Sequence, residues 1–477
     1  MTGGSARRAW YDLAAVSVAL LFLEIALIRW IATEVRIFAY LSNLVLLACF
    51  VGMGGGCYGA ARRCRFGYIL PLLTLLVCAA VLPWKVVIAG RSLHPVRDIP
   101  AMVTVFTESP VWGHYTSDDI TGSALFGLAA TLAVFALIAA LFYPLGQRLG
   151  ALLDRTNRPI LAYSVNVAAS IAGVWLFGLL SLWCVPPAVW FVLATALIVL
   201  TWPSRRHAAL GVLCAAVMVA VLSVPEPRAI ERLWSPYQKL VLHPCERDGL
   251  VTGYGIAVNN AGYMQLLDLS DTFIAAHPAQ FPDGIVGRTF CHYDLPYRLR
   301  PAAQRVLILG AGAGNDAAGA LRAGVRQVDA VEIDPGIFRL GRQYHPAQPY
   351  ADSRVQVHID DARAFLRRAQ PGYDVVTFGL LDAHTSASAY NNTRLDHYIY
   401  TREALAQAAA LLAPDGVLTL VFESHYPWLT DRFYGMLRDV FGYSPLMVFA
   451  RNGNRYGWGG TMFICPRDPA AFAASVR

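Results

Sequence analysis

Long apolar runs alternate with short polar connections over the first half of the chain. A helix that crosses a bilayer needs about 20 mostly apolar residues. Seven segments approach or exceed that length, the last two being the shortest: residues 13–31, 38–55, 68–88, 123–143, 160–183, 188–202 and 208–224. The pattern therefore predicts an α-helical transmembrane bundle of about seven spans over residues 1–224, a multi-pass membrane domain.

The pattern changes at Pro225, after which charged residues recur regularly. Residues 225–300 contain short strand-like runs separated by turn residues, such as KLVLHP, YGIAVNN and YMQLLDL. These runs predict a small antiparallel β subdomain. After Arg300, apolar strands alternate with helical segments, which is typical of an α/β domain with a parallel sheet. We therefore expect a Rossmann-like domain over residues 301–477.

The composition fits a chain that lies partly in lipid. Of the 477 residues, 56% are hydrophobic and only 15% are charged, values outside the range of ordinary soluble domains. The net charge is +7, but most Arg residues of the first half lie in clusters between apolar runs. This indicates membrane orientation and no nucleic-acid partner. The nine Cys residues include no CxxC pair, so we expect neither a metal site nor a disulfide framework.

Two ionisable residues, Glu24 and Arg29, lie inside the first predicted span, where an unpaired charge is costly. Their spacing of five does not place them on one helix face. We therefore expect their partners on other helices, in a structural pair or in a lipid-embedded substrate or proton site.

The segment RVLILGAGAGNDAAGALRAG carries the clearest chemical motif. An apolar strand is followed by Gly310, Gly312 and Gly314 and then by an Ala-rich helix. Glycines let the backbone approach a ligand closely, and the helix start offers free N–H donors. Asn315 opens this helix, where either capping or cofactor contact explains it.

Polar groups end the following strands as well. QVDAVEID ends at Glu332, where a carboxylate can accept from both ribose hydroxyls, and RVQVHID is followed by Asp361 and Ala362. YDVVTFGLLD is followed by Asp382 and His384, before a fifth strand, GVLTLVFES. Strand ends at one edge of a parallel sheet form a crevice. The GxGxG spacing and the acidic group after the third strand favour an adenosyl sulfonium compound over a dinucleotide.

The segments SPYQKL, RVLILGAGAG, VEIDP, RVQVHIDDARAFL, YDVV and LLAPDGVL resemble the spermidine synthase (polyamine aminopropyltransferase) family. The apolar half resembles the multi-pass domain fused to some bacterial members. The resemblance implies a class I S-adenosylmethionine-type transferase that uses S-adenosylmethionine or decarboxylated S-adenosylmethionine, with an amine acceptor under the β subdomain. It also implies that Glu332 holds the ribose, that Asp361 holds the adenine, and that Tyr237 and Gln238 lie at the edge of the acceptor site. It makes a homodimer plausible.

Two departures from the family bear on the reaction. The family has an amine-binding Asp where this chain has Ala313, and a general base where it has Gly379. Asp382 and His384 are therefore our candidates for acid–base catalysis, since a carboxylate and an imidazole at a strand end can deprotonate an acceptor. The alternative is a loop Asp that caps a turn beside a solvated His.

Five further residues are candidates for substrate contact. Tyr293 and Asp294, next to His292, occupy the region where the synthases line their active site, although they can also be ordinary linker packing. Tyr400 ends a dense polar and aromatic stretch, NTRLDHYIYT. Tyr456 and Trp458 match a region where the synthases close over substrate, but aromatic packing explains them as well.

The sidedness of the membrane domain is ambiguous. Basic clusters lie at alternate connections, namely Arg7 and Arg8; Arg62, Arg63 and Arg65; Arg148, Arg155 and Arg158; and Arg205 and Arg206. By the positive-inside rule they place the N-terminus in the cytoplasm and, with seven spans, the C-terminal domain outside. Adenosyl cofactors are not normally available there. We therefore expect a cytosolic domain on a bacterial inner membrane, with a re-entrant or missed segment.

These patterns predict a membrane-bound transferase that moves an aminopropyl or methyl group to an amine or amphipathic acceptor. The alternative is a transporter or sensor whose Rossmann-like domain is a catalytically silent ligand-binding module. A nicotinamide oxidoreductase is the least favoured interpretation.

Overall fold

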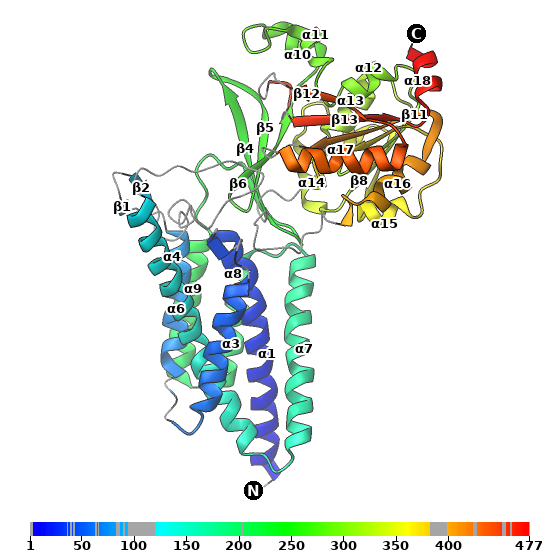
Figure 1. Cartoon of the computed structure of the whole chain (residues 1–477). Helices are drawn as coiled ribbons and strands as arrows, with labels where there is room; N and C mark the ends of the chain where they lie inside the picture. Colours follow the sequence, from blue (N-terminus) through cyan, green and yellow to red (C-terminus); the bar gives the residue numbers. More distant parts are fainter. Residues whose placement is uncertain are drawn as a thin grey trace. The chain divides into compact units, whose positions relative to one another are not determined.

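The computed structural model describes residues 3–35, 37–38, 41, 43–62, 64, 66–82, 86–88, 91–93, 120–202, 204–381, 398–422, 427–450, 455–457 and 460–476. These residues form two compact units, which meet in the sequence between Glu226 and Pro227. Figure 1 shows the elements of both units. Asp382, His384 and Trp458 lie outside the described residues.

The N-terminal unit is helical, apart from one short hairpin. Its elements are α1 (Gly3–Glu34), α3 (Asn43–Tyr58), η1 (Phe66–Tyr68), α4 (Ile69–Val81), β1 (Val86–Ile88), β2 (Arg91–Leu93), α6 (Ile120–Asp154), α7 (Pro159–Leu182), α8 (Pro187–Thr201) and α9 (Arg205–Leu222). Among the described residues, four helices are long and apolar enough to cross a membrane: Arg7–Glu34, Leu125–Asp154, Pro159–Leu182 and Arg205–Leu222. Three shorter apolar helices lie at Asn43–Tyr58, Phe66–Val81 and Pro187–Thr201. The structure therefore supports four candidate spans, fewer than the seven predicted.

The predicted span 68–88 is wrong in its last part. Helix α4 ends at Val81, and β1 pairs with β2 in an antiparallel hairpin. Leu82 already has an extended backbone, with φ −63° and ψ 138°. It precedes Pro83 in the sequence, and a residue before proline disfavours the helical conformation. The apolar composition of the stretch continues beyond the point at which the helix ends.

Glycines allow α3 and α6 to pack closely. A Cβ atom at Gly56 would lie 2.1 Å from the carbonyl oxygen of Tyr143, and one at Gly146 would lie 2.3 Å from that of Met53. Such distances are far below van der Waals contact, so only glycine fits at these positions. Small residues that bring helix backbones together are common in membrane proteins.

Arg29 of α1 has partners on two other helices. Its guanidinium donates to the hydroxyl of Ser181 in α7. It also lies over the ring of Trp190 in α8, 5.1 Å from the centroid. Glu24, on the same helix, is buried with 3% of its surface exposed.

The C-terminal unit begins with a four-stranded antiparallel sheet in the order β3-β4-β5-β6. Its strands are β3 (Glu231–Trp234), β4 (Lys239–Arg247), β5 (Leu250–Val258) and β6 (Ala261–Leu267). Asn259 and Asn260 join β5 to β6 with φ values of 47° and 65°. Two consecutive residues with positive φ are typical of a tight hairpin turn, and Asn tolerates this conformation well.

A seven-stranded mixed sheet follows, in the order β12-β13-β11-β10-β7-β8-β9. The five strands predicted from the sequence are parallel to one another, which confirms the Rossmann-type α/β domain. Two antiparallel strands at one edge were not predicted. The strands are β7 (Arg305–Leu309), β8 (Gln327–Glu332), β9 (Val355–Ile359), β10 (Tyr373–Phe378), β11 (Leu412–Phe422), β12 (Leu446–Ala450) and β13 (Gly460–Pro466).

Helices cover both faces of this sheet, because each buried strand presents apolar residues on both sides. Leu307 and Leu309 of β7 face one apolar cluster, and Val306 and Ile308 face another. The first cluster includes α15, α16 and α17, and the second includes α12 and α13. The helices of this unit are α10 (Asp271–Ala276), α11 (Gly284–Arg288), α12 (Leu295–Leu299), α13 (Asn315–Arg322), α14 (Pro335–Tyr344), η2 (Pro349–Ala351), α15 (Ala362–Leu366), α16 (Arg402–Ala410), α17 (Pro427–Phe441) and α18 (Pro469–Val476).

The α3–α6 contact leads to a prediction about stability. Gly56→Ala should destabilise the helical unit by about 1–3 kcal/mol, because the new methyl group overpacks against a backbone carbonyl. Gly54→Ala is the matched control, since no heavy atom lies within 4 Å of a Cβ there. Thermal unfolding of the full chain in detergent measures both. Equal melting temperatures for the two variants would contradict the close packing.

Candidate functional site

The polar strand ends meet where the strand order of the sheet reverses. β8 and β9 lie on one side of β7, and β10 and β11 lie on the other. Connections that leave in opposite directions open a crevice at the carboxyl ends of the strands, where open α/β sheets bind their ligands. The loop after β7 forms the floor of this crevice.

The glycine loop after β7 has a backbone that other residues rarely adopt. Gly310, Gly312 and Gly314 have φ values of 72°, 55° and 109°. The buried hydroxyl of Tyr350 donates to the carbonyl oxygens of Gly312, at 2.7 Å, and Ala311, at 3.2 Å. The loop is therefore held from below by hydrogen bonds.

Glu332, at the end of β8, holds the loop from the side. One carboxylate oxygen accepts from the backbone N–H of Gly312 at 2.8 Å, and the other from that of Asp334 at 2.8 Å. Burial raises the pKa of Glu332 to about 7, and the backbone donors oppose this shift. Each oxygen retains a lone pair, so the carboxylate can also accept from a ligand hydroxyl.

A pocket of about 610 Å³ lies above Glu332. It is lined by Tyr263, Met264, Gly310, Gly312, Val331, Glu332, Ile333, Asp360, Asp361, Ala362, Leu380, Leu381 and Ile399. One oxygen of Asp361 caps α15 by accepting from the N–H of Ala364 at 2.9 Å. The lining brings together five residues predicted to bind the cofactor, namely Gly310, Gly312, Glu332, Asp361 and Ala362. Their roles as cofactor ligands stay predictions.

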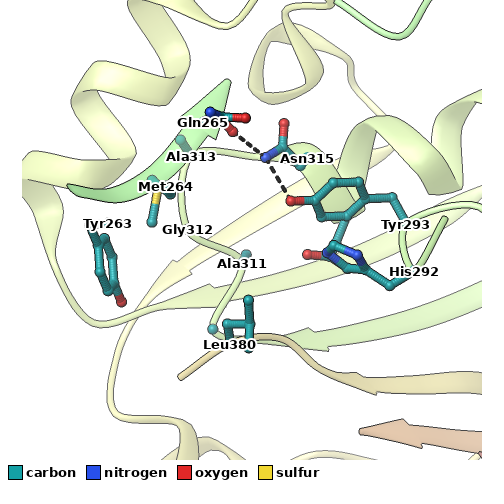
Figure 2. A pocket seen from close by; sticks show the side chains of 12 residues that line it. Tyr263, Met264, Gln265, His292, Tyr293, Ala311, Gly312, Ala313, Asn315 and Leu380 are labelled. Atoms are coloured by element: carbon teal, nitrogen blue, oxygen red, sulfur yellow. Dashed lines mark hydrogen bonds between the residues drawn. The ribbon is translucent and has the colours of Figure 1, made fainter. Parts of the chain in front are cut away.

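A second pocket, of about 500 Å³, lies on the other side of the same glycine loop. It shares with the first pocket Tyr263, Met264, Gly310, Gly312 and Leu380. Its other lining residues are Gln265, His292, Tyr293, Ala311, Ala313, Asn315 and Asp316 (Figure 2). A ligand that passes over the loop can therefore occupy both pockets.

The side chain of Asn315 forms part of the wall and is held on three sides. Its amide donates to the carbonyl of Gln265 at 2.5 Å and to the hydroxyl of Tyr293 at 3.1 Å (Figure 2). His345 accepts at Nδ1 from the N–H of Ala347, so its Nε2–H donates to the Asn315 oxygen at 3.0 Å. Burial lowers the pKa of His345 to about 3, which agrees with this neutral form. Asn315 thus joins α13 to β6 and to the segment before α12.

The predicted substrate residues have different surroundings. Tyr293 lines the second pocket, whereas Asp294 lies 2.7 Å from Arg288 Nε and 2.6 Å from Arg322. Asp294 therefore forms ion pairs with these two arginines, and it is not among the lining residues of either pocket.

Four further predicted residues are not among the lining residues of the two pockets. Gln238 donates to Asp334 at 3.1 Å, next to the half-exposed Tyr237, and neither residue lines the two pockets. The hydroxyl of Tyr400 accepts from the N–H of Leu381 at 3.1 Å, so it fixes the end of β10. Gly314 is the N-cap of α13, and a Cβ there would lie 2.7 Å from Pro349.

Sequence analysis missed the residues that close the site from above. Tyr263 and Met264 of β6 line both pockets, about fifty residues before the glycine loop. Their alternation along YMQLLDL indicated a strand, but nothing in that pattern showed which sheet edge the strand would meet.

Position 379 has no room for a side chain. A Cβ atom there would lie 2.7 Å from the carbonyl oxygen of Gly310. An Asp at this position would displace the glycine loop. The packing of β7 against β10 therefore excludes a carboxylate here.

The parallel strands, the glycine loop and the crevice define the C-terminal unit as a Rossmann-type α/β domain. Residues 291–438 match the model of the Spermine/spermidine synthase domain. The predicted resemblance of the C-terminal region to spermidine synthases is therefore confirmed.

Two of the similar curated proteins are polyamine aminopropyltransferases. The chain is 32% identical over 157 residues to the polyamine aminopropyltransferase of Vibrio vulnificus, covering 32% of this chain and 50% of that protein. It is 41% identical over 124 residues to polyamine aminopropyltransferase 2 of Streptomyces coelicolor, covering 24% of this chain and 21% of that protein. The chain thus spans half or less of these two relatives. The crystal structure of spermidine synthase from Thermotoga maritima matches with a TM-score of 0.37 and 18% identity, over 50% of this chain and 73% of that chain.

The raised pKa of Glu332 leads to a pH prediction. Burial raises this pKa from 4.5 to about 7, so the folded chain holds the proton more tightly than the unfolded chain. The stability from this group is therefore full below pH 4.5 and is lost as the pH rises through about 7. Glu332→Gln should flatten this part of the pH dependence. Hydrogen-exchange protection of β7 and β8, corrected for intrinsic rates, measures it. Glu246→Gln, on the exposed end of β4, is the control.

The tight contact at position 379 leads to a second prediction. Gly379→Ala should weaken binding of an adenosyl ligand at least about tenfold, because the glycine loop must move to admit the methyl group. Gly435→Ala in α17, where no atom lies within 4 Å of a Cβ, should bind normally. Calorimetric titration of the full chain in detergent with 5′-methylthioadenosine compares them, and equal affinities would refute the steric argument.

Proposed function

We propose that this chain transfers an aminopropyl group from decarboxylated S-adenosylmethionine to an amine acceptor. The observation that carries the proposal is that two pockets share one glycine loop as their floor. The pocket beside Glu332 and Asp361 fits the adenosine half of the donor. The other pocket then receives the chain attached to the sulfonium, together with the acceptor. Curated relatives from Vibrio vulnificus, Clostridium acetobutylicum and Streptomyces coelicolor, which are named polyamine aminopropyltransferases, support the same reaction.

The donor supplies an electrophilic carbon next to a positively charged sulfur. Transfer breaks the bond between that carbon and sulfur, forms a bond from the carbon to the acceptor nitrogen, and releases 5′-methylthioadenosine and one proton. The chain's own contribution is to hold the two partners in line, since well-oriented reactants need little further assistance. We assign removal of the proton to Asp382 and His384, which follow β10. Methyl transfer from S-adenosylmethionine, which would release S-adenosylhomocysteine, is the alternative reaction.

We also propose that the helical unit anchors the enzyme in a bacterial inner membrane, with the C-terminal unit in the cytosol. The four long apolar helices support membrane attachment. Supply of the adenosyl donor requires cytosolic access. An even number of spans after a cytoplasmic N-terminus would satisfy both requirements. A reporter that is active on only one side of the membrane, fused after Arg477, tests this placement.

Binding and turnover of the full chain in detergent test the proposed reaction. Glu332→Ala should abolish measurable binding of decarboxylated S-adenosylmethionine, and Asp361→Ala should weaken it about 10- to 100-fold through loss of hydrogen bonds to a charged group. Glu246→Ala is the control. Asp382→Asn should keep binding and lose turnover, followed as release of 5′-methylthioadenosine. If the wild-type chain binds neither decarboxylated S-adenosylmethionine nor S-adenosylmethionine, the proposal is wrong.

Two features favour the second candidate, a membrane transporter or sensor with a silent ligand-binding domain. Ala313 and Gly379 stand where the synthase family has functional carboxylates, and position 379 has no room for one. Under this hypothesis the donor still binds, but the wild-type chain and Asp382→Asn show the same absence of 5′-methylthioadenosine release.

A further inference from the structure

The second pocket contains a carboxylate that the proposed reaction has not yet used. Asp316, the second residue of α13, lines this pocket together with Ala313 and Tyr293. Among the described residues that line the pocket, it is the only one with a carboxylate. Both Ala313 and Asp316 face the same space, although they are three residues apart in the sequence.

Asp316 lies in the first turn of α13, where the helix dipole favours an acid, but it is not the N-cap residue. The N-cap of α13 is Gly314, whose position makes no side-chain cap hydrogen bond. Within the part of the chain that the structure describes, no other side chain forms a hydrogen bond or ion pair with the Asp316 carboxylate. The nearby Arg322 is paired with Asp294 at 2.6 Å. The pocket therefore contains a carboxylate that forms no direct ion pair with a described side chain, and Arg322 acts on it only at longer range.

The other described residues of the pocket wall carry no positive charge, because none of them is Lys or Arg. Burial lowers the pKa of His292 to about 4, so its imidazole is neutral near pH 7. Tyr293 and Tyr263 add aromatic surface, which favours cations. Burial also raises the pKa of Asp316 to about 7, and a bound cation would stabilise its ionised form.

We propose that Asp316 binds the alkylammonium group of a substrate in this pocket, in place of the carboxylate missing at position 313. The inference rests on the proposed function. The ammonium belongs either to the aminopropyl chain of the donor or to the amine acceptor. If Asp316 holds the donor, it selects against S-adenosylmethionine, because the α-carboxylate of that compound would lie next to the carboxylate of Asp316 and be repelled.

The test compares three ligands that share the adenosyl group. Decarboxylated S-adenosylmethionine carries the ammonium, S-adenosylmethionine adds a carboxylate, and 5′-methylthioadenosine has neither group. If Asp316 holds the donor, Asp316→Asn should weaken binding of decarboxylated S-adenosylmethionine about 10- to 100-fold, as expected for a lost charged hydrogen bond. The affinity for 5′-methylthioadenosine should stay unchanged. The variant's preference for decarboxylated S-adenosylmethionine over S-adenosylmethionine should shrink accordingly. Asp248→Asn, on the exposed β4–β5 turn, removes the same charge elsewhere and is the control.

The acceptor alternative has a different result. If Asp316 holds the acceptor, Asp316→Asn should leave both donor affinities unchanged and raise KM for the amine by a similar factor. The double variant Ala313→Asp/Asp316→Asn should recover part of either loss, because it returns a carboxylate to the same pocket. Titration calorimetry and steady-state kinetics of the full chain in detergent measure these quantities.

Two results would overturn the inference, and they are distinguishable. If Asp316→Asn binds all three ligands and the amine as the wild type does, Asp316 has no role in binding the ammonium, while the proposed function stands. If the wild-type chain binds none of the adenosyl ligands, the proposed function fails and this inference fails with it.

Discussion

The candidate site depends on the two hydrogen bonds that the Glu332 carboxylate accepts from Gly312 and Asp334. Charge-assisted bonds of this kind are stronger than neutral ones. They join the loop after β7 to the loop after β8, so the two strand ends cannot move independently. Because Gly312 lies in the floor of both pockets, its position sets the shape of each.

Other contacts also hold the loop after β7 in place. Tyr350 holds the loop from below, and β10 holds it from the side, where Gly379 leaves only enough space for a hydrogen atom facing the Gly310 carbonyl. Asn315 then connects the start of α13 to β6, the strand that contributes Tyr263 and Met264. The pockets are thus built by backbone packing and hydrogen bonds around one loop, and the proposed ligand contacts depend on that framework.

The sequence predicted the parallel strands well because each is a short, continuous apolar run followed by a polar residue. It predicted Glu332 and the glycine loop for the same reason, since strand ends of a parallel sheet share one edge. It could not predict that β6 closes the site, because this depends on the packing of one sheet against another element. The edge strands β12 and β13 were missed, as was the end of α4 before Pro83. In the latter case a local backbone preference outweighs an apolar composition.

The structure also gives a physical reason why the acidic residues of the second pocket differ from the family pattern. Carboxylates at both 313 and 316 would face one pocket that is already lined by buried aromatic groups. Two like charges in such surroundings cannot both ionise easily, so the pKa of one would rise further. Glu332 and Asp316 already have pKa values raised to about 7 by burial. A third carboxylate at Gly379 would add to this repulsion and would also displace the loop. A single carboxylate in the second pocket is therefore an arrangement that can stay ionised once a cation binds, and it places the charge at position 316, where position 313 is apolar.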